Sequence, residues 1–309
     1  TPYFLEILNY HTYYPVRQDI VEKDPDSWFR KPYLMVSNGP FCLEEWKENK
    51  QIKTIKNPYY WDKDRVKLNS IRYLIERIDD EEIWTRYKNK KIDFGYVFPP
   101  EIDIAAEIAS KENNVLADDC LTTYYLCINS KNKPFDDIRV RQALELAINK
   151  NRIVEEGKMN EPIATGFVPY GIPDAEPGSD FRLVGGDYLS KEFTEQNIIK
   201  AKELLKEAGY EDLSKFPTIV ILTRSTDRAK YIEESWEKNL GINVEIEVFK
   251  DVLFAQKKDN QEFDVLINSW IADFLDPINF LGFLASENSF KGILPSEYYN
   301  LVNSSTKIA

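Results

Sequence analysis

The segment that decides the fold covers residues 218–249. It begins with TIVIL (218–222), continues with a mixed stretch that ends in Leu240-Gly241, and closes with INVEIEVF (242–249). Its two outer parts are rich in Val and Ile, which is typical of strands buried in a sheet. Gly241 follows the last apolar residue of the middle part, where helices commonly end. The segment therefore predicts a strand, a helix and a strand in succession, and this alternation indicates an α/β fold.

The alternation continues on both sides of this segment. The hydrophobic pattern predicts strands over residues 124–128 and 263–269, helices over about 134–147 and 198–208, a helix opened by Pro277, and a long loop rich in Gly and Pro over 162–186. The first third predicts a hairpin of residues 41–46 and 51–56, strands over 71–75 and 92–96, and helices over 81–88 and 101–109. We therefore expect a β-rich part of a first lobe in residues 1–121 and a second α/β lobe in residues 122–309.

Composition excludes several classes of protein. The 309 residues suggest about two domains. Lys and Arg total 40 against 52 Asp and Glu, which gives a formal net charge of −12. This acidity argues against nucleic-acid partners and against an anionic membrane surface, because both attract basic faces. No apolar run approaches the roughly 18 residues that a bilayer-spanning helix needs.

A single histidine and three cysteines limit the possible chemistry. His11 is the only residue on which a histidine-dependent nucleophile could be built, and a zinc site with several histidines is impossible. Cys42, Cys120 and Cys127 lack C-x-x-C spacing, and we expect each to be a small buried hydrophobe. We accordingly expect no catalytic residues, no metal site and no cofactor.

Six blocks of sequence that follow one another along most of the chain carry a family resemblance. They are SNGPF (37–41, with Trp46), KNPYYW (56–61), PFDDIRVRQAL (134–144), AKELLKEAGY (201–210), WEKNLGINV (236–244) and SWIAD (269–273). Together they resemble the extracytoplasmic oligopeptide-binding proteins of ABC transporters, the dipeptide, oligopeptide and nickel type of solute-binding protein. Any single block is a weak signal, but six blocks in the family's order are a strong one.

The resemblance implies a periplasmic-binding-protein-like fold, a two-lobe clamp with mixed sheets flanked by helices, which is incomplete in this chain. It also implies a monomeric, non-catalytic protein that captures an oligopeptide and delivers it to ABC transporter permease subunits. Such a protein works outside the cytoplasm, in the periplasm or lipid-anchored on the outer face of the cytoplasmic membrane. A clamp of this kind recognises groups that all peptides share, namely the main chain and the terminal ammonium.

Asp273 stands where the family places the carboxylate that pairs with the peptide ammonium. Its neighbours would exclude water, and a low dielectric strengthens an ion pair; they are Trp270, Ile271, Ala272 and Phe274. A purely structural reading is that Asp273 pairs with a nearby lysine or caps the helix opened at Pro277.

Other candidate ligand-binding residues flank this position. In a strand, Ser269, Ile271 and Asp273 share one face and Asn268 and Trp270 share the other, so main-chain groups near Ser269 and Ile271 would pair with the peptide as an added strand. Thr122, Tyr124 and Tyr125 are further candidate ligand-binding residues, on the strand that enters the second lobe. The two tyrosines would either line pockets for peptide side chains or pack in the core. The candidate cations for the peptide carboxylate are Arg224, Arg228 and Lys230.

The sequence departs from the family in ways that keep the peptide length open. Ile267 stands where one family member has an arginine for the peptide carboxylate, and Thr122 and Ile271 replace a cysteine pair that can form a disulfide there. Both ends of the chain look cut, so the resemblance covers the middle and later part of a larger protein.

Three alternatives stay open. A receptor for signalling peptides would use the same clamp. A hydrolase would need paired carboxylates, and Asp118-Asp119 and Asp136-Asp137 are adjacent pairs, although adjacent side chains point apart and no Asp-Thr-Gly signature is present. The third alternative is a fragment that binds nothing.

Overall fold

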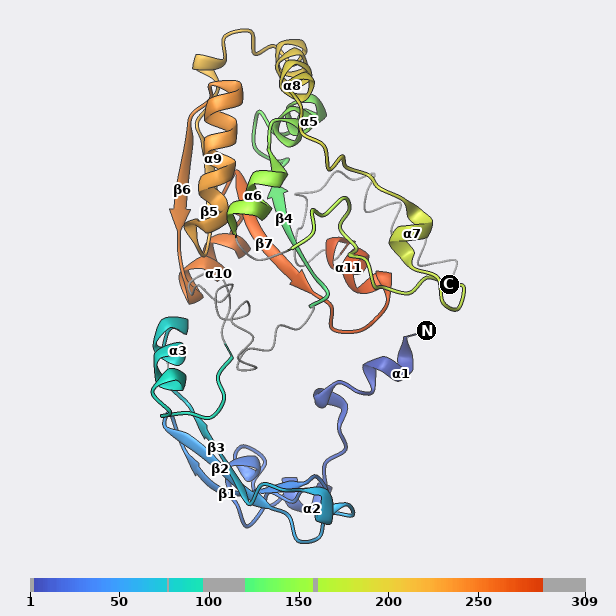
Figure 1. Ribbon diagram of the computed structural model, residues 1–309, viewed down its shortest axis with the longest axis vertical. Helices are drawn as coiled ribbons and strands as arrows, with labels where there is room; N and C mark the ends of the chain where they lie inside the picture. Colours follow the sequence, from blue (N-terminus) through green and yellow to red (C-terminus); the bar gives the residue numbers. More distant parts are fainter. Residues whose placement is uncertain (1–2, 77, 97–119, 158–160, 286–309) are drawn as a thin grey trace. The chain divides into compact units, whose positions relative to one another are not determined.

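The computed structural model describes residues 3–76, 78–96, 120–157 and 161–285 (Figure 1). The chain divides into two compact units. The larger unit combines Thr1–Ile7 with Asp103–Ala309, and the smaller unit is Leu8–Ile102. The predicted lobe boundary at residue 121 stays a prediction, because residues 97–119 lie outside the described ranges.

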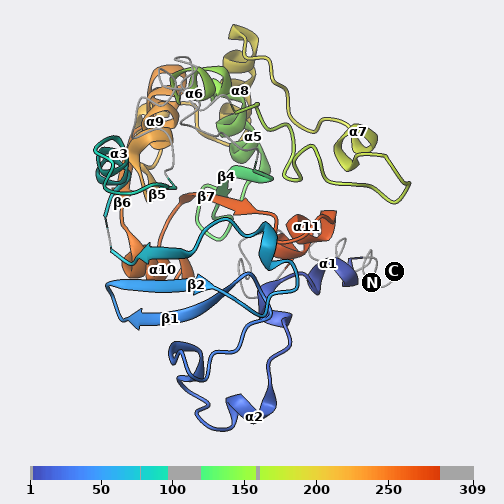
Figure 2. The same cartoon turned by 60° about the horizontal axis from the view of Figure 1, so that its bottom comes forward.

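The smaller unit is built on a three-stranded antiparallel sheet. Strands β1 (Phe41–Lys47), β2 (Gln51–Lys56) and β3 (Ser70–Leu74) pair in the order β1-β2-β3. Figure 2 shows β1 and β2 side by side and running in opposite directions. Helix α3 (Asp80–Lys88) starts where predicted, because the carboxylate of Asp79 accepts the Glu82 N–H at 2.8 Å. The hairpin, the third strand and this helix are confirmed.

The strand predicted over residues 92–96 is wrong. These residues form no strand, and Phe94 and Tyr96 are exposed. Alternation alone does not make a strand, because the main chain also needs a neighbouring edge to pair with. The helix predicted over residues 101–109 lies outside the described residues. The remaining short helices before β1 and β3 are α2 (Gln18–Val21) and the 3₁₀ turns His11–Tyr13, Trp28–Arg30 and Lys63–Arg65.

The larger unit contains a mixed four-stranded sheet. Its strands are β4 (Thr122–Ile128), β5 (Ile219–Thr223), β6 (Val244–Val248) and β7 (Val265–Ile271), in the order β4-β7-β5-β6. Strand β5 runs parallel to β6 and to β7, whereas β4 runs antiparallel to β7. The predicted strand–helix alternation and the mixed sheet are therefore confirmed.

Helices cover both faces of this sheet. Helices α5 (Ile138–Leu146), α8 (Glu195–Glu207) and α9 (Thr226–Leu240) contribute to the main core with one face, and Figure 1 shows α9 along β5 and β6. Helix α10 (Asp251–Asp259) packs Phe254 against Leu222 and Leu266 on the other face. The remaining helices of the unit are α1 (Phe4–Ile7), α6 (Lys150–Gly157), α7 (Phe181–Gly185) and α11 (Pro277–Ala285).

The WEKNLGINV block has a structural explanation. Trp236 is fully buried, and its indole N–H donates to the Leu144 carbonyl at 2.8 Å. Asn239 donates its amide N–H to the Ala147 carbonyl at 2.8 Å, so α9 satisfies carbonyls that the end of α5 leaves unpaired. Gly241 ends α9 with φ +76°, a left-handed conformation that favours glycine. This block therefore holds the core together.

The cysteines only partly follow expectation. Cys127 is buried on the α10 side of the sheet, and burial raises the pKa of its thiol to about 12. Cys42 is half-buried and Cys120 is exposed, so the expectation of three buried cysteines is wrong for Cys120.

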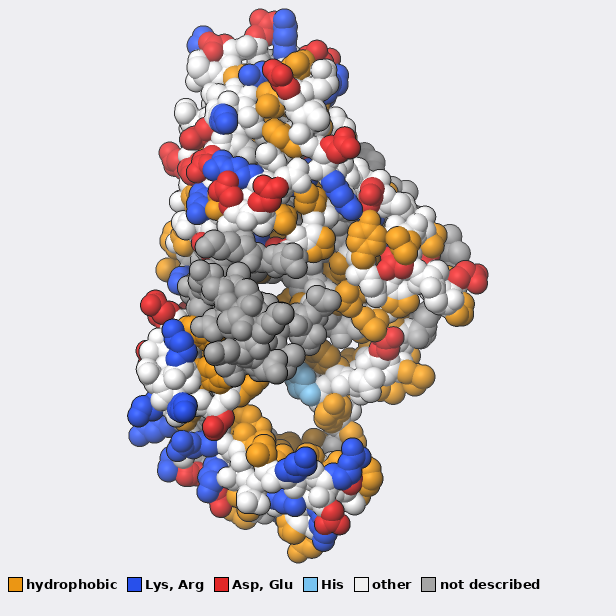
Figure 3. Space-filling view, viewed as in Figure 1, with side chains coloured by type: hydrophobic (Ala, Val, Ile, Leu, Met, Phe, Trp, Pro, Cys, Tyr) orange, Lys and Arg blue, Asp and Glu red, His pale blue; other side chains and the backbone are white. Residues whose placement is uncertain are grey.

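A buried arginine organises the long loop over residues 162–186. Arg182 is 2% exposed and donates to the Thr165 hydroxyl at 3.0 Å and to Asp187 at 3.3 Å. A Cβ at Gly166 would lie 2.6 Å from its guanidinium, so only glycine fits there without displacement. The outer side of α7 keeps Leu183 and Val184 exposed, and Figure 3 shows hydrophobic side chains over this helix.

Replacing Trp236 by phenylalanine tests the role of its indole. The ring keeps most of its buried apolar area, but the Leu144 carbonyl loses its donor, so we expect about 1–3 kcal/mol less stability in urea unfolding. The same change at Trp61, which is 83% exposed, should stay within about 0.5 kcal/mol. Equal effects at the two positions would contradict this role.

Candidate functional site

The β4–β7 ladder brings most of the predicted ligand-binding residues together. Thr122 lies opposite Ile271, Tyr124 opposite Ser269, and Tyr125 opposite Asn268. Directly opposed residues of a ladder share one face of the sheet. The Thr122–Ile271 pairing also agrees with the resemblance, which implies that these two positions can be bridged.

One face of the ladder changes from buried to exposed along its length. Leu126 and Ile267 belong to the main core. Beyond them lies a set that we call the outer ladder face, formed by Thr122, Tyr124, Ser269 and Ile271. Tyr124 is 40% exposed and Ile271 is 52% exposed, so this face offers apolar surface to a ligand.

The opposite face of the ladder is packed. The Tyr125 ring meets Phe167 edge to face at a centroid distance of 5.1 Å, and its hydroxyl accepts from the Asn268 amide at 3.4 Å. Burial raises the pKa of Tyr125, so its phenol stays protonated at neutral pH. For Tyr125, the core-packing reading is the one that the contacts favour.

Asn279 fixes the end of β7 to helix α11. Its side-chain oxygen accepts the Trp270 indole N–H at 2.8 Å and the Asp273 main-chain N–H at 3.3 Å. Asn279 is 7% exposed. This residue escaped the sequence reasoning, and the available signal was an amide inside the otherwise apolar stretch PINFLGFLA.

Asp273 is exposed, so the expectation that its neighbours exclude water from it is wrong. The reason is the orientation of Trp270, the largest of those neighbours. Its side chain points toward Asn279 and packs with Phe280. The capping role considered for Asp273 belongs to Asp276, whose carboxylate accepts the Ile278 N–H at 2.8 Å.

Residues near the start of the chain contact the segment that follows Asp273. The Tyr3 ring stacks on Phe274 with a centroid distance of 4.9 Å, and the Glu6 carboxylate accepts the Leu275 N–H at 2.7 Å. Both contacts lie within the larger unit. No local sequence pattern indicates them, because the partners are 269 residues apart in the second contact.

The three candidate cations have different surroundings. Arg228 is paired with both oxygens of Glu161, at 2.9 and 2.8 Å. Arg224 is exposed, lies 3.9 Å from the Phe254 ring centroid and donates to the Asn268 side-chain oxygen at 3.2 Å. Lys230 is exposed on α9. Of the two arginines, Arg224 is thus the one whose contacts, within the described ranges, include no carboxylate.

The ladder between β5 and β7 is short. It joins Ile221 with Val265 and Leu222 with Leu266, whereas β4 accompanies β7 as far as Ile271. Strand β5 ends at Thr223, and Arg224 follows directly. The end of β5 therefore lies beside the middle of β7, with Arg224 next to it.

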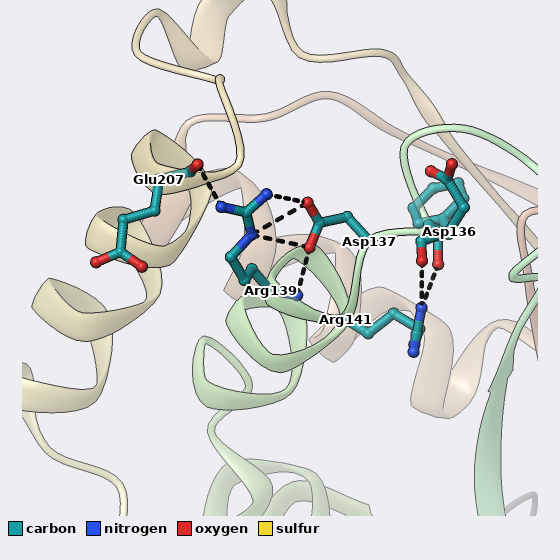
Figure 4. A network of polar contacts seen from close by, with 6 residues as sticks. Asp136, Asp137, Arg139, Arg141 and Glu207 are labelled. Atoms are coloured by element: carbon teal, nitrogen blue, oxygen red, sulfur yellow. Dashed lines mark hydrogen bonds and ion pairs between the residues drawn. The ribbon is translucent and has the colours of Figure 1, made fainter. Parts of the chain in front are cut away.

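The PFDDIRVRQAL block forms a polar network at the start of α5 (Figure 4). Arg139 contacts the Asp137 carboxylate at 2.5 Å and donates to the Glu207 carbonyl at 2.6 Å. Arg141 donates to the Phe135 and Asp136 carbonyls at 2.7 and 3.1 Å. Both arginines are therefore engaged by groups within the fold. In Figure 4 the Asp137 carboxylate points to Arg139 and that of Asp136 points away, so they form no catalytic pair. Asp118 and Asp119 lie outside the described residues.

The described residues contain neither a group of metal-ligating side chains nor a helix that could span a membrane. No three His, Cys, Asp or Glu side chains within the described ranges are grouped closely enough to hold a metal ion. In the same part of the chain, no helix has the length and hydrophobicity needed to cross a membrane.

The mixed sheet with helices on both faces makes this an α/β protein. The chain belongs to the family described as bacterial extracellular solute-binding proteins, family 5 Middle, whose model matches residues 1–292. This is a family of binding proteins and not of enzymes. The resemblance inferred from the sequence blocks is confirmed.

Individual relatives with similar sequences are also named as peptide-binding proteins. The chain is 32% identical over 294 residues to the periplasmic oligopeptide-binding protein OppA of Salmonella typhimurium, covering 93% of this chain and 52% of the relative. It is 31% identical over 309 residues to the dipeptide-binding protein DppE of Bacillus subtilis, covering 97% and 54%. The chain therefore spans about half the length of the curated relatives it matches.

A solved structure supports the fold class. The Haemophilus influenzae OppA complex with RPPGFSPFR has a TM-score of 0.72 and 26% identity, covering 99% of this chain and 60% of the other. The predicted α/β binding-protein fold with mixed sheets flanked by helices is thus confirmed.

The network in Figure 4 predicts a pH dependence of stability. The hydrogen bond from the Arg139 side chain holds the pKa of Asp137 below its ordinary value. A carboxyl with a depressed pKa stabilises the fold above its unfolded pKa, and this contribution is lost as the pH falls through the folded pKa. Asp137→Asn should therefore lower stability at pH 7 and flatten the loss of stability below about pH 5, measured by urea unfolding.

Two further variants separate charge from helix capping. Asp137→Ala also removes the acceptor for the Arg139 N–H and should cost about 1 kcal/mol more than Asp137→Asn. Asp259→Asn, at an exposed position of α10, should keep the wild-type pH profile. A wild-type profile for Asp137→Asn would show that the ion pair contributes nothing.

Proposed function

We propose that this protein is an extracytoplasmic solute-binding protein that captures oligopeptides and delivers them to the permease subunits of an ABC transporter. The observation that carries the proposal is the exposed Asp273, which lies two residues after the end of β7 and whose main-chain N–H is held by Asn279. Membership of the solute-binding family and the peptide-binding relatives support it. Asp273 is exposed at the position where the family places the carboxylate for the ligand ammonium.

The short β5–β7 ladder supports recognition of the peptide main chain. A peptide that adds to β7 beyond Leu266 would continue the line of β5 and hydrogen-bond near Ser269 and Ile271. With its ammonium at Asp273, such a peptide runs antiparallel to β7. Main-chain pairing of this kind is independent of the peptide's sequence.

Arg224 is the favoured partner for the peptide carboxylate. A peptide that runs antiparallel to β7 from Asp273 directs its C-terminus toward the end of β5, where Arg224 contacts Asn268. Arg228 is less suited to this role, because Glu161 already neutralises it.

Three broader parts of the proposal follow from the family. We infer that the protein acts as a monomer, in the periplasm or lipid-anchored outside the cytoplasmic membrane. Residues 1–121 would contribute to one lobe of the clamp and residues 122–309 to the other. Native mass spectrometry of the purified protein tests the core of the proposal: heterogeneous co-purified peptides support it, whereas cleaved products of an added peptide would indicate a hydrolase.

Asp273→Asn tests the ammonium site. A charge-assisted hydrogen bond contributes about 1.5–3 kcal/mol, so wild type should bind a free peptide roughly 10- to 100-fold more tightly than its N-acetylated form. The variant should lose this preference in calorimetric titrations. Asp259→Asn, at an exposed site on α10, should retain it. Equal weakening of both peptide forms by Asp273→Asn would contradict the assignment.

Arg224→Gln tests the carboxylate site in the same way, with a peptide acid and its C-terminal amide. We expect wild type to prefer the acid by about 10-fold or more and Arg224→Gln to bind the two forms alike. Lys230→Gln removes a nearby exposed cation and should keep the preference. If Arg224→Gln also keeps it, another cation binds the carboxylate.

A further inference from the structure

Arg228 is held on two sides. Its guanidinium carbon lies 3.7 Å from the centroid of the Tyr124 ring, which is a close cation–π contact. One of its terminal nitrogens contacts both oxygens of Glu161, at 2.9 and 2.8 Å. The Arg228 side chain is 19% exposed. An arginine fixed by a carboxylate in this way holds the ring that it covers in one orientation.

Tyr124 stays partly exposed although Arg228 covers one face of its ring. The exposed fraction of Tyr124 is 40%. Its ladder partner is Ser269, a residue with a small side chain. Ile271, 52% exposed, extends the apolar surface on the same face.

The spacing of strands lets a ligand reach this ring. Neighbouring strands lie about 4.8 Å apart, so a peptide added to β7 on the side away from β4 lies roughly 10 Å from β4. A long side chain on the peptide can span part of this distance over Ser269, and the Tyr124 side chain spans the rest. A side chain longer than serine at residue 269 would block that path.

We propose that Tyr124 is a platform for one peptide side chain, that Arg228 and Glu161 are its positioning residues, and that the platform selects an aromatic or large aliphatic side chain. This inference rests on the proposed function and names the ligand class of the same site. Apolar side chains are favoured because they bury exposed ring surface. Cationic side chains are disfavoured because Arg228 already occupies one face of the ring.

The larger unit offers a matched control. Arg152 contacts Glu234 at 2.5 Å and lies 5.3 Å from the Tyr231 ring centroid, so it repeats the combination of arginine, glutamate and tyrosine on α6 and α9. Figure 3 shows charged side chains of both signs over these two helices. Neither Arg152 nor Glu234 belongs to the β4–β7 ladder.

The test compares tetraglycine with peptides that carry one Phe or one Lys at each position in turn, by calorimetric titration of the whole protein. In wild type, one Phe position should raise affinity about 10-fold over glycine, and Lys there should not. Arg228→Met and Ser269→Leu should each reduce this Phe-to-Gly ratio at least threefold. Arg152→Met should keep it.

Two conservative variants identify the positioning role. Glu161→Gln keeps the size of the side chain but loses its charge, and it should reduce the ratio as Arg228→Met does. Arg228→Lys keeps a cation near the ring without the two-oxygen contact, and it should restore part of the ratio. A merely structural role would lower the affinity for all peptides alike and leave the ratio unchanged.

Three results would overturn the inference: an unchanged ratio in Arg228→Met, an equal reduction in Arg152→Met, or a wild-type preference for Lys over Phe. Its failure is distinguishable from failure of the proposed function. If wild type binds free peptides more tightly than acetylated ones but binds Phe and Gly peptides equally, peptide capture is supported and the role of Tyr124 is contradicted. If wild type binds none of the peptides, both fall.

Discussion

The antiparallel pairing of β4 with β7 is the constraint on which the rest of the larger unit depends. It joins segments more than 130 residues apart, and side chains at its inner end reinforce it: Asn129 donates to the Phe263 carbonyl across a separation of 134 residues. The ladder supplies buried side chains to the cores on both faces of the sheet. Where the core ends, the same two strands continue and their side chains become accessible. One interaction therefore provides both the interior of the unit and the candidate binding face.

Two of the six sequence blocks that identify the family, WEKNLGINV and PFDDIRVRQAL, have structural roles. Trp236 and Asn239 bind carbonyls at the end of α5, and Asp137 and Arg139 form the network at its beginning. These groups are buried or engaged by main-chain atoms, so their chemistry is used within the fold. Only the SWIAD block reaches the candidate site. A family can thus be recognised from residues that hold its lobe together, whereas the positions that we propose for ligand preference, Tyr124 and Glu161, lie outside these blocks.

Charge pairing distinguishes the candidate groups from one another. Arg224 and Arg228 lie four residues apart and are equally basic in sequence, yet Glu161 neutralises one of them and an amide contacts the other. At Asp273 the expected shielding is missing. Trp270, which the sequence suggested would exclude water from Asp273, donates its indole N–H to Asn279 instead. Asp273 is consequently exposed. The contacts of Arg224, Arg228 and Trp270 therefore distinguish these candidate residues better than their residue types do.

The sequence by itself determined the α/β class, the family, and the approximate positions of the strands and of helices α3, α5, α8, α9 and α11. Those features follow from local periodicity, from capping residues such as Asp79 and Asp137, and from Gly241 at a left-handed position. Tertiary structure alone decided that residues 92–96 form no strand, that Trp270 bonds Asn279, and that Arg228 is held between Glu161 and Tyr124. The physical reason is that strand pairing, burial and ion pairing depend on partners distant in sequence, which no local pattern contains.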